Sequence, residues 1–267
     1  DVENYPGYSE GVNGPQMMMD FRAQAERFET DIRTGYVTKV DFSGPVHKVW
    51  VDEKEELQAH SIIISTGATA KWLGLESELR IRDLGGGVSA CAVCDGFFYR
   101  GQDVAIVGAG DTAAEEALYL SKVCKSVKMI VRRDEMRASK IMQQRVFDAG
   151  NIEVLWNTET LEVLGDQVVE GVKVVNNQTN EETVLDVTGF FVAIGHKPNT
   201  DIFKGWLDMD DTGYLKHRPD SSHSNIEGVF ISGDAGDKVY RQAVTAAGTG
   251  CMAALDAERF LGEKGLH

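Results

Sequence analysis

The chain has 267 residues, of which 42% are hydrophobic and 26% are charged, as is ordinary for a soluble globular protein with one or two domains. Its formal net charge of −15 repels nucleic acid and anionic membranes, so neither is an expected partner. No run of 18 apolar residues is present, and no membrane span is predicted. Four cysteines are too few for a disulfide framework, which fits a reducing, intracellular compartment.

The first part of the chain predicts one helix followed by strands. Met17, Phe21, Ala25 and Phe28 recur at helical spacing, which predicts a helix over residues 16–28 with these side chains in the core. Residues 71–82 show no clear period and are expected to be irregular. Three consecutive glycines at 85–87 then predict a flexible segment. Strands are expected at 35–42, 46–51 and 61–65, the last ending in a turn at Thr66-Gly67.

Two cysteines lie at the spacing Cys91-x-x-Cys94, and Asp95 follows at once. A zinc site would need two further ligands, and no second Cys-x-x-Cys or suitably spaced histidine pair supplies them. A redox pair is therefore favoured, and no metal is expected. Asp95 can donate a proton to a leaving thiolate, or it can cap a helix. Cys124 and Cys251 are expected to be small buried side chains.

A βαβ unit is predicted over residues 104–131. A short apolar strand leads into a glycine-rich turn and then a helix to about residue 120, before a second strand at 127–131. Glycines allow a pyrophosphate to approach the backbone, and the helix N-terminus favours its negative charge. Alternatively, these glycines serve only close packing. The residues of the turn expected at the cofactor are Gly108, Gly110, Asp111, Thr112 and Ala113.

Arginines follow the second strand, where an enzyme that uses NAD would carry an acid for the ribose hydroxyls. Guanidinium groups bind phosphate in a bidentate manner, so Arg132, Arg133 and Arg137 favour the 2′-phosphate of NADPH. The alternative is a solvated run of charges, which their place at the strand end makes the weaker interpretation.

The remainder of the chain again predicts strands with two helices. The strands at 160–164, 168–175 and 182–187 have the turn pattern of an antiparallel meander. The chain has 28 glycines and only 5 prolines, which suits an α/β fold with several tight strand-to-helix turns. The other expected elements are helices over 139–148 and 242–260 and strands at 152–156, 189–195 and 228–231.

Several motifs together resemble the low-molecular-weight thioredoxin reductases. The segment 89–99 resembles their redox motif, and 107–116 with 132–134 resembles their NADPH motif. The segments 232–234 and 240–243 resemble their second FAD motif. The resemblance implies FAD and NADPH as cofactors, thioredoxin as partner, and a cytoplasmic homodimer. It also implies FAD contacts at Asn4, Thr66, Gly67, Asp234, Arg241, Gln242 and Ala243.

The resemblance further implies two nucleotide-binding, three-layer (ββα/Rossmann-like) domains. The FAD domain would comprise residues 1–72 and 199–267, and an inserted NADPH domain, 73–198, would carry the cysteine pair. Electrons would pass from NADPH through FAD to the Cys91–Cys94 disulfide, with Cys94 facing the flavin and Cys91 attacking thioredoxin. The family's first strand and glycine-rich FAD turn have no counterpart before Asp1, so an N-terminally incomplete chain is expected.

Two other functions stay open. One is a flavin-dependent reductase of another disulfide partner, of the kind that serves a peroxiredoxin. The other is a flavin-free, NADP(H)-binding regulatory module without catalysis. An absorption spectrum of the full-length protein, before and after NADPH, would separate the enzymes from the binding module.

Overall fold

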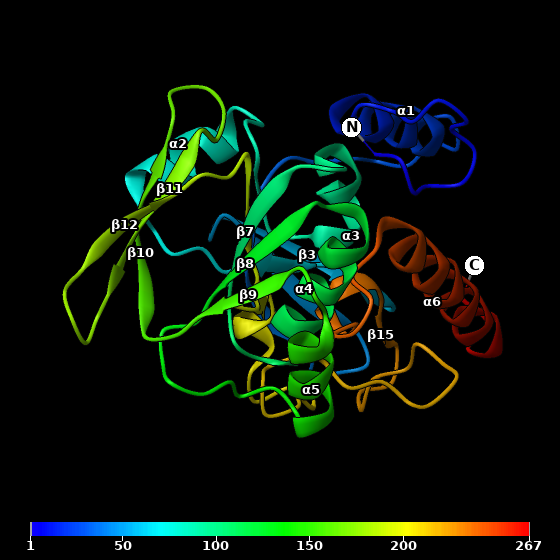
Figure 1. Cartoon of the computed structure of the whole chain (residues 1–267). Helices are drawn as coiled ribbons and strands as arrows, with labels where there is room; N and C mark the ends of the chain where they lie inside the picture. Colours follow the sequence, from blue (N-terminus) through cyan, green and yellow to red (C-terminus); the bar gives the residue numbers. More distant parts are fainter. Residues whose placement is uncertain (1, 267) are drawn as a thin grey trace. The chain divides into compact units, whose positions relative to one another are not determined.

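The computed structural model describes residues 2–266 and divides the chain into two compact units. Unit 1 is built from two pieces, Asp1–Thr69 and Lys197–His267. Unit 2 is one continuous piece, Ala70–His196. Figure 1 shows the elements in the colours of the sequence. The predicted domain breaks lay after residues 72 and 198, and the units divide after Thr69 and His196.

Unit 2 is organised around a five-stranded parallel sheet in the order β6-β13-β7-β8-β9. Alternate residues of its strands enter different cores, as the two-residue period of a strand requires. Val104 and Ile106 of β7 pack in one core, whereas Ala105 packs in the other. The strands are β6 (Val88–Ser89), β7 (Asp103–Val107), β8 (Ser126–Ile130), β9 (Ile152–Leu155) and β13 (Gly189–Val192).

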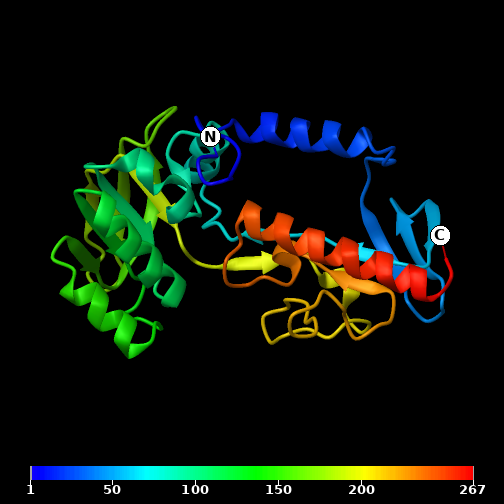
Figure 2. The same cartoon turned by 90° about the vertical axis from the view of Figure 1, so that its right-hand side faces the viewer.

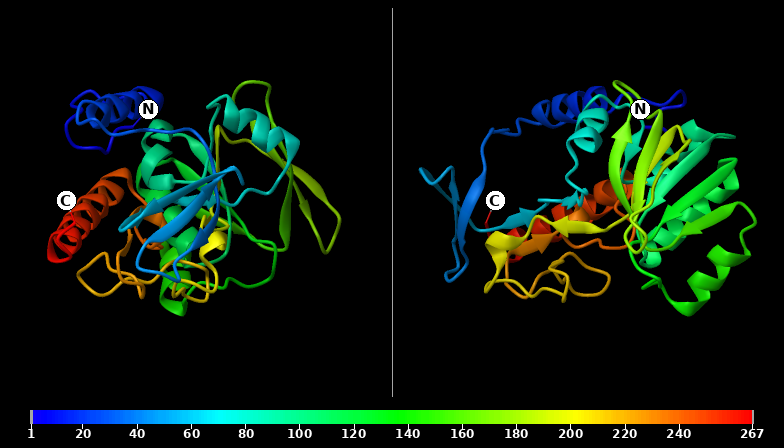
Figure 3. Two further views of the ribbon diagram at one scale, coloured as in Figure 1. Left: turned by 180° about the vertical axis from the view of Figure 1, so that it is seen from behind. Right: turned by 60° about the vertical axis from the view of Figure 1, so that its left-hand side comes forward.

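Each face of this sheet is covered by a different layer. One core joins the sheet to the helices α3 (Ala92–Asp95), α4 (Asp111–Val123) and α5 (Lys140–Asp148). The other joins it to α2 (Glu76–Asp83) and to an antiparallel meander. Figure 3 (right) shows the meander and the helices on opposite sides of the sheet. The meander strands are β10 (Thr158–Leu164), β11 (Gly171–Asn176) and β12 (Glu182–Leu185).

Unit 1 holds two smaller sheets and the long helix α6 (Ala243–Glu263). An antiparallel sheet has the order β1-β2-β3, and β4 pairs with β15 in parallel. Phe230 of β15 packs with Ala253 and Ala257 of α6, and Figure 2 shows this helix (red) beside the strand. The strands are β1 (Val37–Asp41), β2 (His47–Val51), β3 (Glu55–Ala59), β4 (Ile62–Ile64) and β15 (Val229–Ile231).

Short elements complete the two units. Helix α1 (Gly14–Glu26) opens unit 1, and the 3-10 turns η1 (Gly96–Tyr99), η2 (Asp201–Phe203) and η3 (Gly233–Ala235) follow later in the chain. The strands β5 (Ala68–Ala70) and β14 (His196–Pro198), where the chain passes between the units, form a two-stranded sheet.

The predicted βαβ unit and the antiparallel meander are confirmed. Three local predictions are wrong. Residues 71–82 are not irregular throughout, because α2 begins at Glu76. Phe28 is not a core residue, since it follows the end of α1 and its side chain is 70% exposed. Gly86 is not in an open, flexible stretch: it is buried, and a Cβ there would lie 1.8 Å from the carbonyl oxygen of Gln167.

Candidate active site

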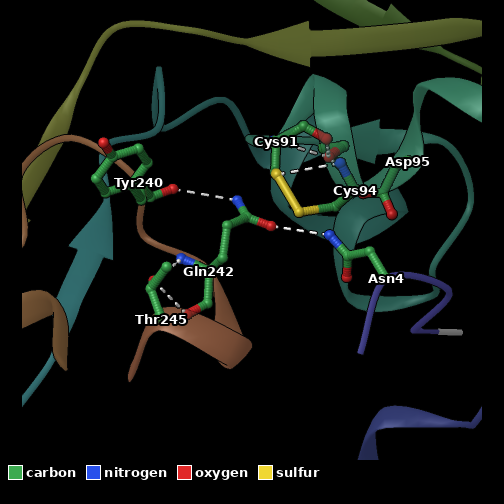
Figure 4. Close-up of a disulfide and its surroundings, with 8 residues drawn as sticks. Asn4, Cys91, Cys94, Asp95, Tyr240, Gln242 and Thr245 are labelled. Carbon is green, nitrogen blue, oxygen red and sulfur yellow. Dashed lines mark hydrogen bonds between the residues drawn. A yellow bond between two sulfur atoms is a disulfide. The ribbon is translucent and has the colours of Figure 1, made fainter. Parts of the chain in front are cut away.

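Cys91 and Cys94 form a disulfide in unit 2, with their Cα atoms 5.3 Å apart (Figure 4). Cys91 is the last extended residue before α3, and its sulfur accepts a hydrogen bond from the backbone N–H of Cys94 at 3.2 Å. The short helix therefore begins between the two cysteines and holds them at bonding distance. Both cysteines are half-buried, so the pair lies at the surface of its unit rather than in its core.

Asp95 ends α3 and does not act as a helix cap. Its side chain makes no capping bond to the turn that follows. Instead, its Oδ2 accepts a hydrogen bond from the hydroxyl of Ser89 at 2.5 Å. Burial raises the pKa of the nearby Tyr99, and the charge of Asp95 adds to the rise. The capping interpretation of Asp95 is therefore wrong, and its carboxyl lies one residue from Cys94 with a defined hydrogen-bond donor.

Apolar side chains are exposed around the disulfide. Val93, between the cysteines, is 49% exposed, and Phe97 in η1 is 58% exposed. Phe98 in the same turn is also exposed. Large apolar side chains that gather on a surface are typical of a protein-binding site. The sequence motif contained these phenylalanines, but only the structure shows that they face solvent.

A pocket of about 310 Å³ in unit 2 lies over the carboxyl ends of β7 and β8. It gathers Gly108, Arg132, Arg133 and Arg137, as predicted from sequence. A Cβ at Gly108, whose φ is +150°, would lie 2.4 Å from the carbonyl oxygen of Ala193. Only glycine fits there. Sequence reasoning missed the other lining residues, which are Leu73, Val107, Ala109, Ile130, Glu135 and Ile194.

The rest of the glycine-rich turn has structural contacts. The carboxylate of Asp111 accepts the backbone N–H of Ser139 at 2.9 Å, and this bond lowers the pKa of Asp111. Ala113 is fully buried in the core beneath the turn. Gly110 precedes the first residue of α4, and Thr112 is its second residue. These four residues are not among those that line the pocket.

The residues predicted for FAD all lie in unit 1. The side-chain amide of Asn4 donates to Gln242 Oε1 at 2.8 Å, and Gln242 precedes the first residue of α6, Ala243 (Figure 4). The backbone oxygens of Thr66 and Gly67 both accept hydrogen bonds from Asn199, each at 2.9 Å.

Asp234 and Arg241 lie in the segment that leads from β15 to α6. Among residues 2–266, no side chain or backbone group donates a hydrogen bond to the buried Oδ1 of Asp234. Burial raises the pKa of Asp234, Asp237 adds to the rise, and Arg241 opposes it. A buried carboxylate oxygen without a donor costs free energy unless a ligand supplies one. A cofactor hydroxyl at this position would satisfy it, so the residues present fit a flavin dinucleotide.

The remaining two cysteines differ in their exposure to solvent. Cys124 is buried, and burial raises its pKa to about 11. Cys251 is exposed, contrary to the expectation of a buried side chain, because it lies on the outer face of α6. Across residues 2–266, no three His, Cys, Asp or Glu side chains come together as a metal site would require. In that same stretch, no helix is long and apolar enough to cross a membrane.

The sequence model of the pyridine nucleotide-disulphide oxidoreductases matches residues 4–250. The chain belongs to this family. Thioredoxin reductases are among its curated relatives: that of Rickettsia conorii is 50% identical over 98% of this chain and 84% of its own length. The thioredoxin reductase of Streptomyces coelicolor is 49% identical over 98% of this chain and 80% of its own.

Solved structures give the same result. A thioredoxin reductase from Giardia duodenalis superposes with a TM-score of 0.91 at 39% identity, over 98% of this chain and 85% of the other. The enzyme from Streptococcus pyogenes has a TM-score of 0.92 at 35% identity, with the same coverage. Within the family, the chain is therefore a thioredoxin reductase with two Rossmann-like domains.

Proposed function

We propose that the chain reduces the disulfide of thioredoxin, with electrons that pass from NADPH through FAD to the Cys91–Cys94 disulfide. The observation that carries the proposal is this disulfide, formed across three residues beside a carboxylate and in the same unit as a pocket lined by three arginines. The family membership supports the same reaction. In this reaction NADPH supplies a hydride and FAD converts it into two electrons for the disulfide.

Unit 2 supplies the NADPH site in this proposal. Because Gly108 has no Cβ, the turn can pack against Ala193 and Ala113, and the N-terminus of α4 favours the negative charge of the pyrophosphate. Arg132, Arg133 and Arg137 bind the 2′-phosphate. Gly110, Asp111, Thr112 and Ala113 complete the cofactor turn at the start of α4: Asp111 fixes Ser139, and Ala113 packs beneath Gly108.

Unit 1 supplies the FAD site. Asn4 and Gln242 are already joined by a hydrogen bond, and their remaining polar atoms can bind the cofactor. The Oδ1 of Asp234 would accept a hydrogen bond from a hydroxyl of FAD. The remaining residues proposed around the cofactor are Thr66, Gly67, Arg241 and Ala243.

The two cysteines divide the exchange between them. When the disulfide takes up two electrons, its S–S bond breaks, and each sulfur becomes a thiol after gaining a proton. Asp95 donates one of these protons, as its place beside Cys94 allows. Cys91 then attacks the thioredoxin disulfide to form a mixed disulfide, and Cys94 resolves it. By resemblance, Cys94 is also the sulfur that faces the flavin.

The proposal includes three assignments that follow from the family. Thioredoxin docks on the exposed side chains around the disulfide, Val93, Phe97 and Phe98. Unit 1 is the FAD domain and unit 2 the NADPH domain. The protein is a cytoplasmic homodimer. Light scattering of the purified holoenzyme tests the dimeric state.

The decisive experiment separates entry of electrons from their exit. Cys91→Ser should leave the flavin reducible by NADPH, seen as loss of its visible absorbance, and abolish NADPH oxidation coupled to thioredoxin. Cys94→Ser should block both thioredoxin reduction and transfer out of the flavin, because a single sulfur cannot complete the cycle. Cys251→Ser is the matched control, since Cys251 is free and exposed on α6, and it should behave as the native protein.

Other results would select the alternatives. If Cys91→Ser kept near-normal thioredoxin reduction, the cysteine pair would not be the exit route. Faster reduction of a peroxiredoxin-type disulfide carrier than of thioredoxin would identify a different partner. A colourless full-length protein that still binds NADPH would identify the flavin-free binding module.

A further inference from the structure

Ser89 is a buried serine at the end of β6, two residues before Cys91, and its side chain is only 8% exposed. Its hydroxyl oxygen lies 2.5 Å from Asp95 Oδ2 and accepts the backbone N–H of Cys91 at 3.0 Å. The carbonyl oxygen of Cys91 is farther away, at 3.4 Å. One side chain thus connects the carboxyl beside Cys94 with the backbone of Cys91.

The direction of these hydrogen bonds follows from counting protons. A serine hydroxyl has one proton to donate and two lone pairs that accept. The N–H of Cys91 can only donate, so it occupies a lone pair of Ser89. The hydroxyl proton is then free for Asp95, whose oxygen at 2.5 Å is much nearer than the competing carbonyl at 3.4 Å. Ser89 therefore donates to the carboxylate.

The carboxyl of Asp95 depends on this bond for its orientation. The last torsion of an aspartate side chain has a broad energy profile and does not by itself fix the carboxyl plane. Among residues 2–266, Ser89 is the side chain that donates a hydrogen bond to this carboxyl, and the carboxyl makes no capping bond to the backbone of the turn that follows. Without the hydroxyl, the carboxyl would turn among several orientations, and only some of them serve proton transfer with the cysteines.

We propose that Ser89 is a positioning residue for dithiol–disulfide exchange, in which its hydroxyl holds the Asp95 carboxyl in the orientation that proton transfer requires. The inference rests on the role proposed above for Asp95. It adds a residue outside the Cys-x-x-Cys-Asp motif to the machinery of exchange.

In the direction of thioredoxin reduction, Cys91 first loses its proton to solvent and its sulfur attacks the partner disulfide. A mixed disulfide forms, and one partner thiolate leaves. Cys94 gives its proton to the Asp95 carboxylate, and its sulfur attacks Cys91 Sγ. The Cys91–Cys94 disulfide forms again as the second partner thiolate leaves. Two electrons pass to the partner, whose two thiolates gain protons from solvent and from Asp95.

The test is a single-turnover exchange that needs no NADPH. Protein reduced with dithiothreitol and freed of reductant is mixed anaerobically with increasing oxidised thioredoxin, and the thiols formed are trapped with a maleimide and counted by mass. Ser89→Ala, Asp95→Asn and the double variant are compared. Ser126→Ala is the matched control, because Ser126 donates to Asp103 at 2.6 Å in a serine–aspartate pair at the opposite, amino-terminal end of the sheet.

Ser89→Ala should lower the saturating rate about tenfold, part of the roughly 10²- to 10⁴-fold that a positioned acid–base group contributes. The thioredoxin concentration that gives half the maximal rate should not change, because the docking side chains are intact. The double variant should be no slower than Asp95→Asn, since a residue that acts only through Asp95 has nothing left to position. Ser126→Ala should react at the native rate.

Three outcomes would overturn the inference. One is a native rate for Ser89→Ala while Asp95→Asn is slow. Asp95 would then keep its proposed role, and Ser89 would have no positioning role. Another is an equal tenfold loss when Ser89→Ala is added to Asp95→Asn, which would make its effect independent of the carboxyl. A native rate for Asp95→Asn would remove the proposed role of Asp95 and the inference with it.

Discussion

Single residues show most directly where the structure adds chemistry to the sequence motif. The motif supplied Cys91, Cys94 and Asp95, but it could not show which of the two roles Asp95 has. The structure removes the capping role, because the Asp95 carboxylate makes no bond to the turn that follows and instead accepts the hydroxyl of Ser89. Likewise, the arginines were predicted from their place after a strand, and the structure puts all three beside one pocket.

Replacing Arg132 and Arg133 together with alanine should narrow the preference for NADPH over NADH. Each charge-assisted hydrogen bond to a phosphate contributes about 1.5–3 kcal/mol, so KM for NADPH should rise roughly 10- to 100-fold per lost contact while KM for NADH changes little. Steady-state kinetics with both cofactors measure this. The control is Arg100→Ala, because Arg100 is exposed in the same unit and is not among the residues that line the pocket. Equal use of both cofactors by the native protein would contradict the assignment.

Asp234→Asn should stabilise the flavin-free protein at neutral pH but lower its flavin content. Because burial raises the folded-state pKa, the folded protein binds more protons than the unfolded chain between the two pKa values, and stability falls as pH rises through this window. Asparagine does not ionise, so the variant avoids this loss of stability. Its gain in free energy of unfolding over the native protein should be greatest above the raised pKa and smallest below about pH 3.8. Urea unfolding at several pH values measures it, and a gain independent of pH would exclude the titration.

Among the elements, those with a strong period were predictable and those held by side-chain contacts were not. The strand–turn–helix–strand run 104–131 has short apolar strands whose residues are mostly buried, and its position was predicted to within a few residues. Helix α2 was missed because it has eight residues, six of them charged or polar, and no apolar stripe. What fixes it is Glu78, which is fully buried. Gly86 was wrongly predicted to be flexible, because the sequence does not show that the backbone of Gln167 packs closely against it.

Glu78→Gln should destabilise the start of α2. The carboxylate of Glu78 accepts the backbone N–H groups of Leu73, Gly74 and Leu75 at 2.8–3.2 Å, and an amide would present a donor to at least one of them. The expected loss is about 1–3 kcal/mol, with faster hydrogen exchange at these three amides. Glu76→Gln, exposed in the same turn, should cost much less. A loss no larger than that of Glu76→Gln would show that the three hydrogen bonds do not hold the helix.

At the scale of the whole molecule, composition and motifs allowed the fold class to be predicted, whereas the limits of the units depend on contacts. Many glycines with few prolines indicated an α/β protein, and the resemblance implied an inserted domain. No composition change marks residues 69–70 or 196–197, where the chain leaves one unit for the other. These limits are set by which residues pack together, and local patterns in the sequence do not reveal those long-range contacts.

The chain enters and leaves unit 2 at neighbouring residues, which affects whether each unit can be expressed separately. In unit 2, the N–H of Lys71 donates to the carbonyl of Gly195 at 2.9 Å, so its first and last residues meet. In unit 1, Asn199 is hydrogen-bonded to Gly67 at 2.9 Å and to Thr69 at 3.0 Å, so the two cut ends also meet. Each unit has a core of its own.

Residues 70–196 expressed alone should therefore fold and be retained on a 2′,5′-ADP matrix, without flavin. The remaining pieces, joined from residue 69 to residue 197 by a linker of about two to five residues, should close as a hairpin does. Circular dichroism with affinity retention measures the first, and an unfolded fragment would show that neighbouring ends are not sufficient. The pairing of ends makes each unit a separable cassette, which evolution or an engineer can exchange without redesigning the other.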